Sequence, residues 1–504
     1  MNAISPDRLR LPALTLTALL AACSGGGGDA PAVQGESGQR PVLRIDDASA
    51  GEGDGALRFT VTLDGDPGQR VTVDVAVEDG TARAGSDYRP PATTRLEFAP
   101  GDTRRTLAVP LVDDRVVETS ETLRVRLTVA DAAVAVARGE AVGRIADDDR
   151  PYLHGDDPAA DGDFVKLDRA GRPLPADAAE WACVRDARTG LVWEVKTGDG
   201  GLHDRDHRYA WRHSDARFNG GDPGALSGPD GRCLSDAGEA VDGPCNTEAF
   251  VQQVRAEGLC GFRDWRLPTR AELRNLVDFT VAERSATTPT IDTGHFPHTV
   301  SGPYWTATPS ADRADEAWLV DFWDGDVQFG AKGNTYRVRL VRGARPWGDP
   351  VASPCRDDLP ASAPAARFER GADTVRDRYT GLVWRLCALG QSGPGCETGA
   401  GEERLVSPAE AEAEAENLAR QTGQPWRLPT VKELESILEL GCREPSVDQT
   451  VFPKSPIRPF WTATPGAGAP DSAWQINTFL GGSYFFPVTQ QAAVRLVRPI
   501  APGE

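Results

Sequence analysis

Carboxylates gather at the ends of predicted strands in the first third of this sequence. They are Glu52, Asp87, Asp113, Asp114, Glu118, Glu121, Asp147, Asp148 and Asp149. Strand ends that lie far apart in sequence can meet at one pole of a β-sandwich, where several carboxylates repel one another unless cations lie between them. Ca²⁺ takes about six to eight oxygen ligands in irregular geometry, so the pattern predicts structural Ca²⁺. The alternative is a metal-free sandwich with a solvated acidic end.

A second chemical feature is Cys23. Arg8 and Arg10 precede an apolar run from Leu11 to Leu20, and Ala21 and Ala22 stand directly before the cysteine. This order is typical of a secretory signal, and its last four residues resemble a lipobox, in which the cysteine thiol receives a lipid. The glycines of 25–28 then suit a flexible tether. We predict an exported protein with a lipid anchor at Cys23, which is periplasmic or surface-exposed. Residue 24 is Ser and not Asp, which favours the outer membrane. The alternative is an ordinary signal peptide with an incidental cysteine.

The other eight cysteines form two sets of four. They are Cys183, Cys233, Cys245 and Cys260, then Cys355, Cys387, Cys396 and Cys442. An even number in an exported chain predicts disulfides, and four cysteines allow three connectivities. We favour Cys183–Cys260 with Cys233–Cys245, and Cys355–Cys442 with Cys387–Cys396.

Composition excludes some classes of function. The chain has 504 residues and a net charge of −20, which disfavours nucleic acid and acidic polymers as partners. Its 53 glycines and 39 prolines suit short strands and loops, and its length suits about three domains.

Residues 42–145 alternate apolar and polar side chains in short runs, such as 57–63, 71–77 and 123–127, which predicts an antiparallel sandwich. The segments 79–82, 85–88 and 98–102 and the closing triple aspartate resemble the Calx-beta domain. The resemblance implies an immunoglobulin-like sandwich in which the acidic residues named above are Ca²⁺ ligands, Glu121 less surely. Arg115 departs from the family pattern, which often has an acid there.

The remaining sequence contains an internal duplication. The segments TGLVW, WRLPT, WTAT and RLVR each occur twice, and from Phe296 onward the two copies keep a constant offset of 156 residues. In both copies T-x-x-E, at Thr269 and Thr430, predicts a helix start, and further helices are expected at 247–257 and 408–420. Strands at 304–308, 317–322, 327–330 and 336–341 should follow in the first copy.

These repeats resemble the Lcl C-terminal domain, a family named from a bacterial collagen-like adhesin. The element order also resembles the C-type lectin-like fold, by analogy only. The expected fold is therefore an all-β sandwich followed by two α+β lectin-like domains. The expected organisation is signal peptide 1–22, tether 23–40, Calx-beta domain 41–150, linker 151–180, first copy 181–346, linker 347–366 and second copy 367–500.

Few residues in the repeats point to catalysis. His203, His207 and His213, with Asp204 and Asp206, lie in an insertion found only in the first copy, where neighbouring glycines favour a solvated loop over a metal site. The tryptophans that recur in both copies favour core packing. We therefore expect no enzyme.

Trp323 with Asp321 and Asp324 is our candidate ligand surface, since an exposed aromatic ring beside acids suits a sugar; Trp323 has no counterpart, because Leu480 lies near that position. The function favoured is a surface binding protein or adhesin for a glycan or extracellular matrix ligand. The alternatives are an envelope structural protein that contacts a bacterial protein partner, or a polysaccharide-acting enzyme with Asp321 and Asp324 as its acid pair.

Overall fold

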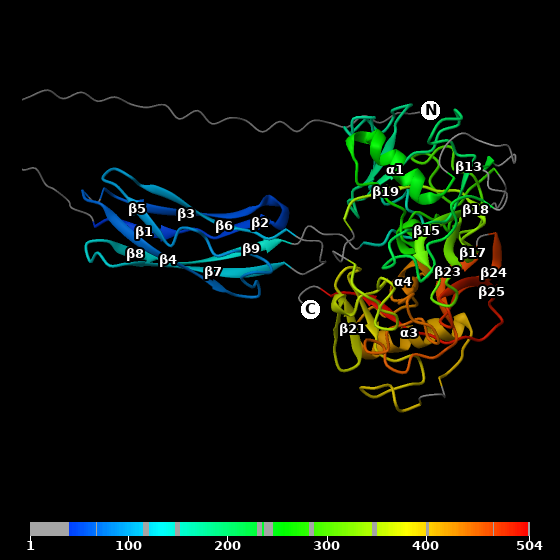
Figure 1. Ribbon diagram of the computed structural model, residues 1–504. Helices are drawn as coiled ribbons and strands as arrows, with labels where there is room; N and C mark the ends of the chain where they lie inside the picture. The colour runs from blue at the N-terminus through cyan, green and yellow to red at the C-terminus, as the bar shows by residue number, and fades with distance from the viewer. Residues whose placement is uncertain are drawn as a thin grey trace, which may run out of the picture.

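The computed structural model describes residues 40–66, 68–113, 120–146, 152–228, 234–235, 245–281, 287–344, 350–399, 403–466 and 468–501. Figure 1 shows a β-sandwich and a larger unit formed by both repeats. None of the helices in these residues is long and apolar enough to span a membrane.

The sandwich forms because its strands alternate buried apolar and exposed polar side chains, as in β3, where every second residue from Leu57 to Leu63 is fully buried. One sheet has the order β6-β3-β1-β8 and the other β2-β9-β7-β4-β5. The elements are β1 Val42–Ile45, β2 Ala48–Gly51, η1 Glu52–Asp54, β3 Ala56–Asp64, β4 Val71–Asp79, β5 Arg95–Phe98, β6 Arg104–Pro110, β7 Glu121–Val129, β8 Ala135–Arg138 and β9 Glu140–Ala146.

The first repeat contains two sheets of its own, β10-β11-β12-β19 and β14-β13-β18, and contributes three strands to a third. Its elements are β10 Phe164–Leu167, β11 Cys183–Asp186, β12 Val192–Glu194, β13 His207–Ala210, β14 Leu234–Ser235, α1 Thr247–Glu257, η2 Leu259–Gly261, α2 Arg270–Asn275, β15 Pro303–Pro309, β16 Glu316–Asp321, β17 Val327–Ala331, β18 Thr335–Tyr336 and β19 Val341–Arg342. Helix α1 has the predicted bounds.

The second repeat has its own sheet, β20-β21-β22-β26, which is equivalent to β10-β11-β12-β19 of the first. Its elements are η3 Ala365–Arg367, β20 Phe368–Arg370, β21 Thr374–Asp377, β22 Leu382–Arg385, α3 Pro408–Thr422, α4 Val431–Ser436, β23 Pro459–Gly466, β24 Ala469–Asn477, β25 Gly482–Pro487 and β26 Val497–Pro499. The predicted capping boxes start α2 and α4, because Thr269 and Thr430 each accept a hydrogen bond from the backbone of the glutamate three residues later.

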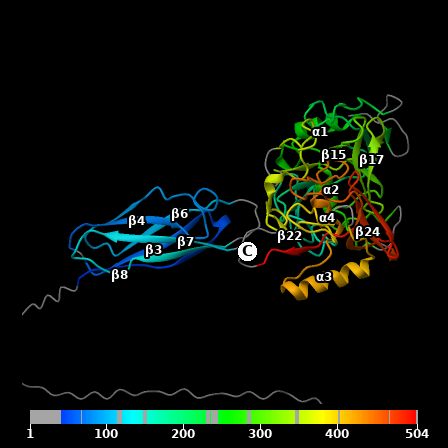
Figure 2. The ribbon, with the colours of Figure 1, turned by 90° about the horizontal axis from the view of Figure 1, so that it is seen from below.

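The two repeats share one six-stranded sheet, β15-β16-β17-β25-β24-β23. At its centre Val327 of β17 pairs antiparallel with Ser483 of β25. These residues are 156 positions apart and therefore equivalent, so a local twofold axis passes between them. Helices α2 and α4 pack on each other, and a single buried core contains tryptophans of both repeats, Trp193, Trp318, Trp384 and Trp474. Figure 2 shows α2 and α4 together inside this unit, with α3 on its outside. We call the contact between the two repeats the seam.

The segments expected as linkers are packed into the larger unit. Strand β10 pairs with β11 along its whole length, so residues 151–180 supply an edge strand. Tyr152 is 6% exposed, and its backbone N–H donates to the carbonyl of Tyr379 in the other repeat. In the segment 347–366, Leu359, Ala361 and Ala363 are buried. Both segments are therefore packed parts of the folded unit, and not the linkers we expected.

Three disulfides have the pairings we favoured: Cys183–Cys260, Cys355–Cys442 and Cys387–Cys396. Cys245 is disulfide-bonded too, but Cys233, its predicted partner, lies outside the described residues. Cys23 and the signal segment also lie outside them.

Candidate functional site

One pole of the sandwich gathers the acidic loops. Gly51 at the end of β2 pairs in parallel with Ala146 at the end of β9, and Glu121 at the start of β7 pairs with Ile145. Glu52 therefore lies beside the last residues of β9. The backbone N–H of Val112 donates to the carbonyl of Asp87 at 3.0 Å, which brings the Asp87 loop next to Asp113.

Two carboxylates at this pole are buried: Glu52 is 4% exposed and Asp87 is 8% exposed, while Asp113 is exposed. The backbone N–H of Arg83 donates to Asp87 Oδ2 at 2.5 Å. Buried carboxylate oxygens at converging strand ends fit a Ca²⁺ site. The other predicted ligands, Asp114, Glu118, Asp147, Asp148 and Asp149, lie outside the described residues.

A different group has metal-ligand geometry within the described part of the chain. His154, Asp161 and Asp163 place ligand atoms within 4.8 Å of one another. However, His154 Nδ1 lies 2.9 Å from Asp161 and its Nε2 lies 3.0 Å from Asp186, while Arg188 pairs with Asp163. Both ring nitrogens are thus engaged by carboxylates, and the group forms a buried ion-pair network.

The network has an equivalent in the second repeat. Asp186 accepts from the Thr189 hydroxyl, and Asp377, 191 residues later, accepts from the Thr380 hydroxyl. Arg367 pairs with Asp377 where His154 pairs with Asp186. Burial opposes ionisation of Asp186, but the hydrogen bonds of His154 and Thr189 still hold its pKa below the usual range. The equivalent buried aspartate thus contacts a histidine in the first repeat and an arginine in the second.

The candidate ligand surface lies at the turn between β16 and β17. Trp323 is 44% exposed, and its backbone N–H donates to Asp321 Oδ1 at 2.8 Å. Burial, together with the charge of Asp324, raises the pKa of Asp321 to about 6. Gln328 on β17 donates to Asp321 Oδ2 at 3.3 Å. The turn thus presents an indole ring and a fixed carboxylate side by side.

Trp323 does have a counterpart, contrary to our expectation. In the second repeat the backbone N–H of Phe479 donates to Asn477 Oδ1 at 2.9 Å, the same contact that Trp323 makes with Asp321. Phe479 is 45% exposed. The constant offset of 156 residues identifies this pair, whereas Leu480 corresponds to Asp324.

Two further aromatic side chains lie exposed on β25, and sequence reasoning did not find them. Tyr484 is 48% and Phe486 is 37% exposed, and their ring centroids are 6.5 Å apart. Residues two apart on a strand lie on the same face. The equivalent positions in the first repeat are Gln328 and Gly330, so only a comparison of the two copies on the shared sheet would have shown this patch.

The three histidines of the insertion do not converge on a metal. His203 bridges two carboxylates, with 2.8 Å from Nδ1 to Glu194 and 2.8 Å from Nε2 to Glu257. Its side chain is 13% exposed, so the expected solvated loop is wrong here. His213 instead packs against Phe218. A cleft of about 550 Å³ lies beside this cluster, lined by Trp181, Lys196, His203, Glu257 and His298.

The seam buries several charged side chains. Arg270 Nη2 lies 2.7 Å and Arg274 Nε lies 3.4 Å from the Glu435 carboxylate, and all three side chains are at most 4% exposed. Arg274 and Glu435 are 161 residues apart, the offset of the WRLPT helices, so they occupy equivalent positions with opposite charge. The Arg274–Glu435 reversal could have been found by aligning the copies residue by residue.

Comparisons with known proteins identify both parts of the chain. A model of the Lcl C-terminal domain matches residues 182–342 and 373–498. The chain belongs to the Lcl C-terminal domain family. A model of the Calx-beta domain matches residues 38–149, so the N-terminal sandwich is a Calx-beta domain.

Three individual relatives cover a small part of this chain. Human sodium/calcium exchanger 2 is 40% identical over 74 residues, which are 14% of this chain and 8% of the exchanger. The apo form of the Calx CBD1 domain is 26% identical and covers 22% of this chain and 100% of its own, with a TM-score of 0.21. The calcium binding domain CBD12 of CALX1.1 is 27% identical and covers 21% of this chain and 45% of its own, with a TM-score of 0.20. TM-scores this low add nothing to the family match.

Proposed function

We propose that this member of the Lcl C-terminal domain family is an exported binding protein, anchored by a lipid on Cys23, which holds its ligand without converting it. In this proposal the Calx-beta domain is a calcium-stiffened stalk. The paired repeats act as lectin-like modules that present a glycan or matrix ligand surface outside the cytoplasm, from the outer membrane.

The observation that carries the proposal is a group of exposed aromatic side chains with a half-buried carboxylate, on the shared sheet and in the turn between β16 and β17. Trp323 and Tyr484 offer ring faces, and Asp321 offers a carboxylate held by hydrogen bonds. A sugar ring presents apolar C–H faces and hydroxyl donors, so it matches rings beside a fixed acceptor. Strand β16, which ends at Asp321, and strand β25, which carries Tyr484, are each paired on both sides, which holds these two side chains on a rigid sheet.

The buried Glu52 and Asp87 support calcium at the pole of the sandwich, since carboxylate oxygens are the ligands that Ca²⁺ prefers. Ca²⁺ bound there would fix the loops that leave β2 and β9. Its role in the proposal is mechanical, because these residues lie on a different domain from the aromatic surface.

The experiment is a glycan and glycosaminoglycan array probed with the protein, with and without Ca²⁺. Saturable binding that Trp323→Ala reduces about tenfold supports the proposal. Leu226→Ala is the control, because Leu226 is also an exposed apolar side chain, at 70%, but lies elsewhere in the first repeat.

Absence of glycan binding in both conditions would reject the glycan ligand. The exposed Phe479, Tyr484 and Phe486 would then favour a protein partner in the envelope, because aromatic side chains are enriched in protein interfaces.

A further inference from the structure

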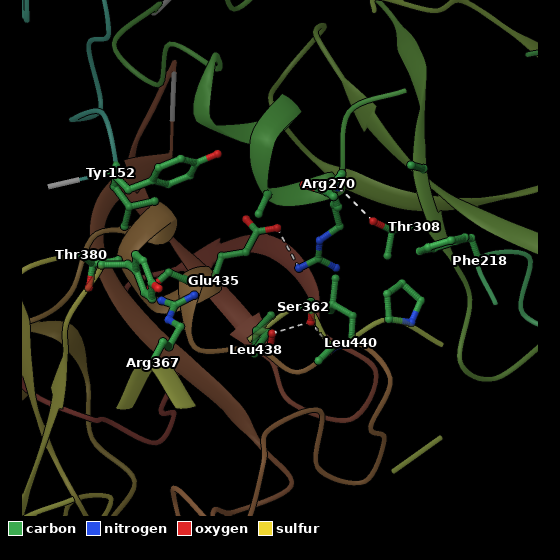
Figure 3. Close-up of a pocket in the computed structure, with 18 of the residues that line it drawn as sticks. Tyr152, Phe218, Arg270, Thr308, Ser362, Arg367, Thr380, Glu435, Leu438 and Leu440 are labelled. Atoms are coloured by element: carbon green, nitrogen blue, oxygen red, sulfur yellow. Dashed lines mark hydrogen bonds and ion pairs between the residues drawn. The ribbon is translucent and has the colours of Figure 1, made fainter. Parts of the chain in front are cut away.

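A cavity lies at the seam, enclosed by both repeats and by the two segments that join them to the rest of the chain. It offers about 80 Å³ to water-sized molecules, and its walls are mostly apolar. Figure 3 shows the lining side chains: Arg270 and Thr308 of the first repeat face Glu435, Leu438 and Leu440 of the second, with Ser362 between the two leucines. The space exists only because the repeats pack together.

The guanidinium group of Arg270 in this wall lacks acceptors for two of its nitrogens within the described part of the chain. Arg270 is 0% exposed; its Nη2 pairs with Glu435, and its guanidinium carbon Cζ lies 4.2 Å from the centroid of the Trp318 ring. Its Nε and Nη1 have no hydrogen-bond partner among the residues that the structure describes. In Figure 3 the edge of the guanidinium opposite Glu435 points toward Thr308 and Leu440. Buried N–H donors without acceptors cost free energy, so this side of the cavity favours an oxygen ligand.

The charge balance favours an anionic oxygen. Arg270 and Arg274 share the single carboxylate of Glu435. Burial lowers the pKa of Arg270, and Glu435 offsets this only in part because Arg274 repels it. The other nearby acid, Asp326, accepts a hydrogen bond from Ser483, which in turn accepts one from Arg274. These hydrogen bonds therefore link Asp326 to Arg274 and not to Arg270. The remaining lining arginine, Arg367, is already paired with Asp377.

We propose that the seam cavity binds a small carboxylate with an apolar body, its carboxylate accepting hydrogen bonds from Arg270 Nε and Nη1. The apolar body lies against Leu438 and Leu440. The second repeat does not form the same site, because its position equivalent to Arg270 is Val431. This site is separate from the aromatic surface, and it does not rest on glycan binding.

The experiment titrates the full chain with sodium butyrate by isothermal calorimetry, with 1-butanol and n-butylammonium as probes of similar size and different charge. Saturable butyrate binding at one site, at least about tenfold tighter than either other probe, is the expected result. Equal responses to the three probes, or no response to butyrate, overturn the proposal.

Two variants locate the site. Arg270→Met removes the donors, and Ala361→Leu fills the space from the segment that lies under the cavity while leaving every charge in place. Both should lose butyrate binding, and Arg172→Met, an exposed arginine paired with Asp168, should retain it. If Arg270→Met fails to fold, Ala361→Leu still decides, because unchanged butyrate binding in that variant places the ligand elsewhere. Neither variant should alter glycan binding at Trp323.

Discussion

At the residue scale the seam depends on Glu435, which pairs with both Arg270 and Arg274 in a buried setting. Glu435→Gln leaves two guanidinium groups without a counter-charge. Breaking a buried ion pair by removing one partner costs about 3–5 kcal/mol, so we expect a loss of that size in the free energy of unfolding of the paired repeats. Chemical denaturation followed by tryptophan fluorescence measures it, since the fully buried tryptophans lie in this unit.

The matched control is Glu416→Gln. Glu416 pairs with Arg420 on the outside of α3, and both side chains are more than 60% exposed. An exposed pair contributes at most about 1 kcal/mol. Equal effects of the two variants would show that the seam carboxylate contributes no more than a surface charge.

His203 makes the stability of the first repeat depend on pH. Burial lowers its pKa, but hydrogen bonds to Glu194 and Glu257 outweigh burial and the repulsion of Lys196, so the net pKa is raised above 6.5. A raised pKa means that the folded state holds the proton more tightly than the unfolded state. The stabilisation is therefore complete below about pH 6.5 and is lost as the pH rises through the folded-state pKa.

The measurement is the melting temperature of the protein and of His203→Gln between pH 5 and 9. We expect the variant to melt lower at pH 5 and the difference to shrink toward pH 9, by a few degrees. His207→Gln is the control, because burial lowers the pKa of His207 and its pH dependence should have the opposite sign. A difference for His203→Gln that grows with pH would contradict the raised pKa.

At the scale of elements, local signals in the sequence predicted where helices and strands lie, but they did not predict how the strands pair. The capping threonines located α2 and α4, and β15, β16 and β17 lie within a residue or two of the predicted ranges, but the strand predicted at 336–341 is divided between β18 and β19. The pairing of β17 with β25 was not predictable, because strand periodicity shows which face is buried but not which edge is paired. Strand β10 was missed because 151–180 reads as a polar, Pro- and Gly-containing segment.

The candidate site was predictable only in part, for a related reason. Asp321 and Trp323 lie in a local turn and were found, whereas Arg270 was not, because its burial depends on contact with α4 of the other repeat. A charged residue at the start of a helix is usually exposed. Tertiary contacts alone reverse that expectation here.

Two disulfides of the second repeat differ in the length of the loop that each closes. Cys355–Cys442 closes a loop of 87 residues and Cys387–Cys396 one of 9. In the chain-entropy view the longer loop restricts the unfolded state more, which corresponds to about 4.6 kcal/mol against about 2.6 kcal/mol. We expect C355A/C442A to lower the free energy of unfolding by more than C387A/C396A. Urea denaturation of the two double variants measures the difference, and the reverse order would mean that packing, not loop closure, dominates.

At the scale of the whole molecule, the two repeats form one folded unit and not two independent domains. They share a sheet, a core and a buried charge cluster, and Tyr152 of the first joining segment contacts the second repeat. The Calx-beta sandwich has its own separate core. The molecule is thus a sandwich followed by a double domain, and the cavity at the seam needs both repeats.

This arrangement predicts which pieces can associate when the repeats are made as separate chains, 152–344 and 350–501. Each alone exposes its half of the common core and the free edge of β17 or β25, so neither should melt cooperatively.

Because Arg274 and Glu435 are equivalent by the local twofold, a pair of first repeats would oppose two arginines and a pair of second repeats two glutamates. Only the mixture brings opposite charges together, so light scattering should find a 1:1 complex from the mixture and no ordered homodimer. Glu435→Arg in the second piece should abolish the complex, and adding Arg274→Glu in the first should restore it; a stable, cooperatively melting single repeat would show that the seam is not required for folding.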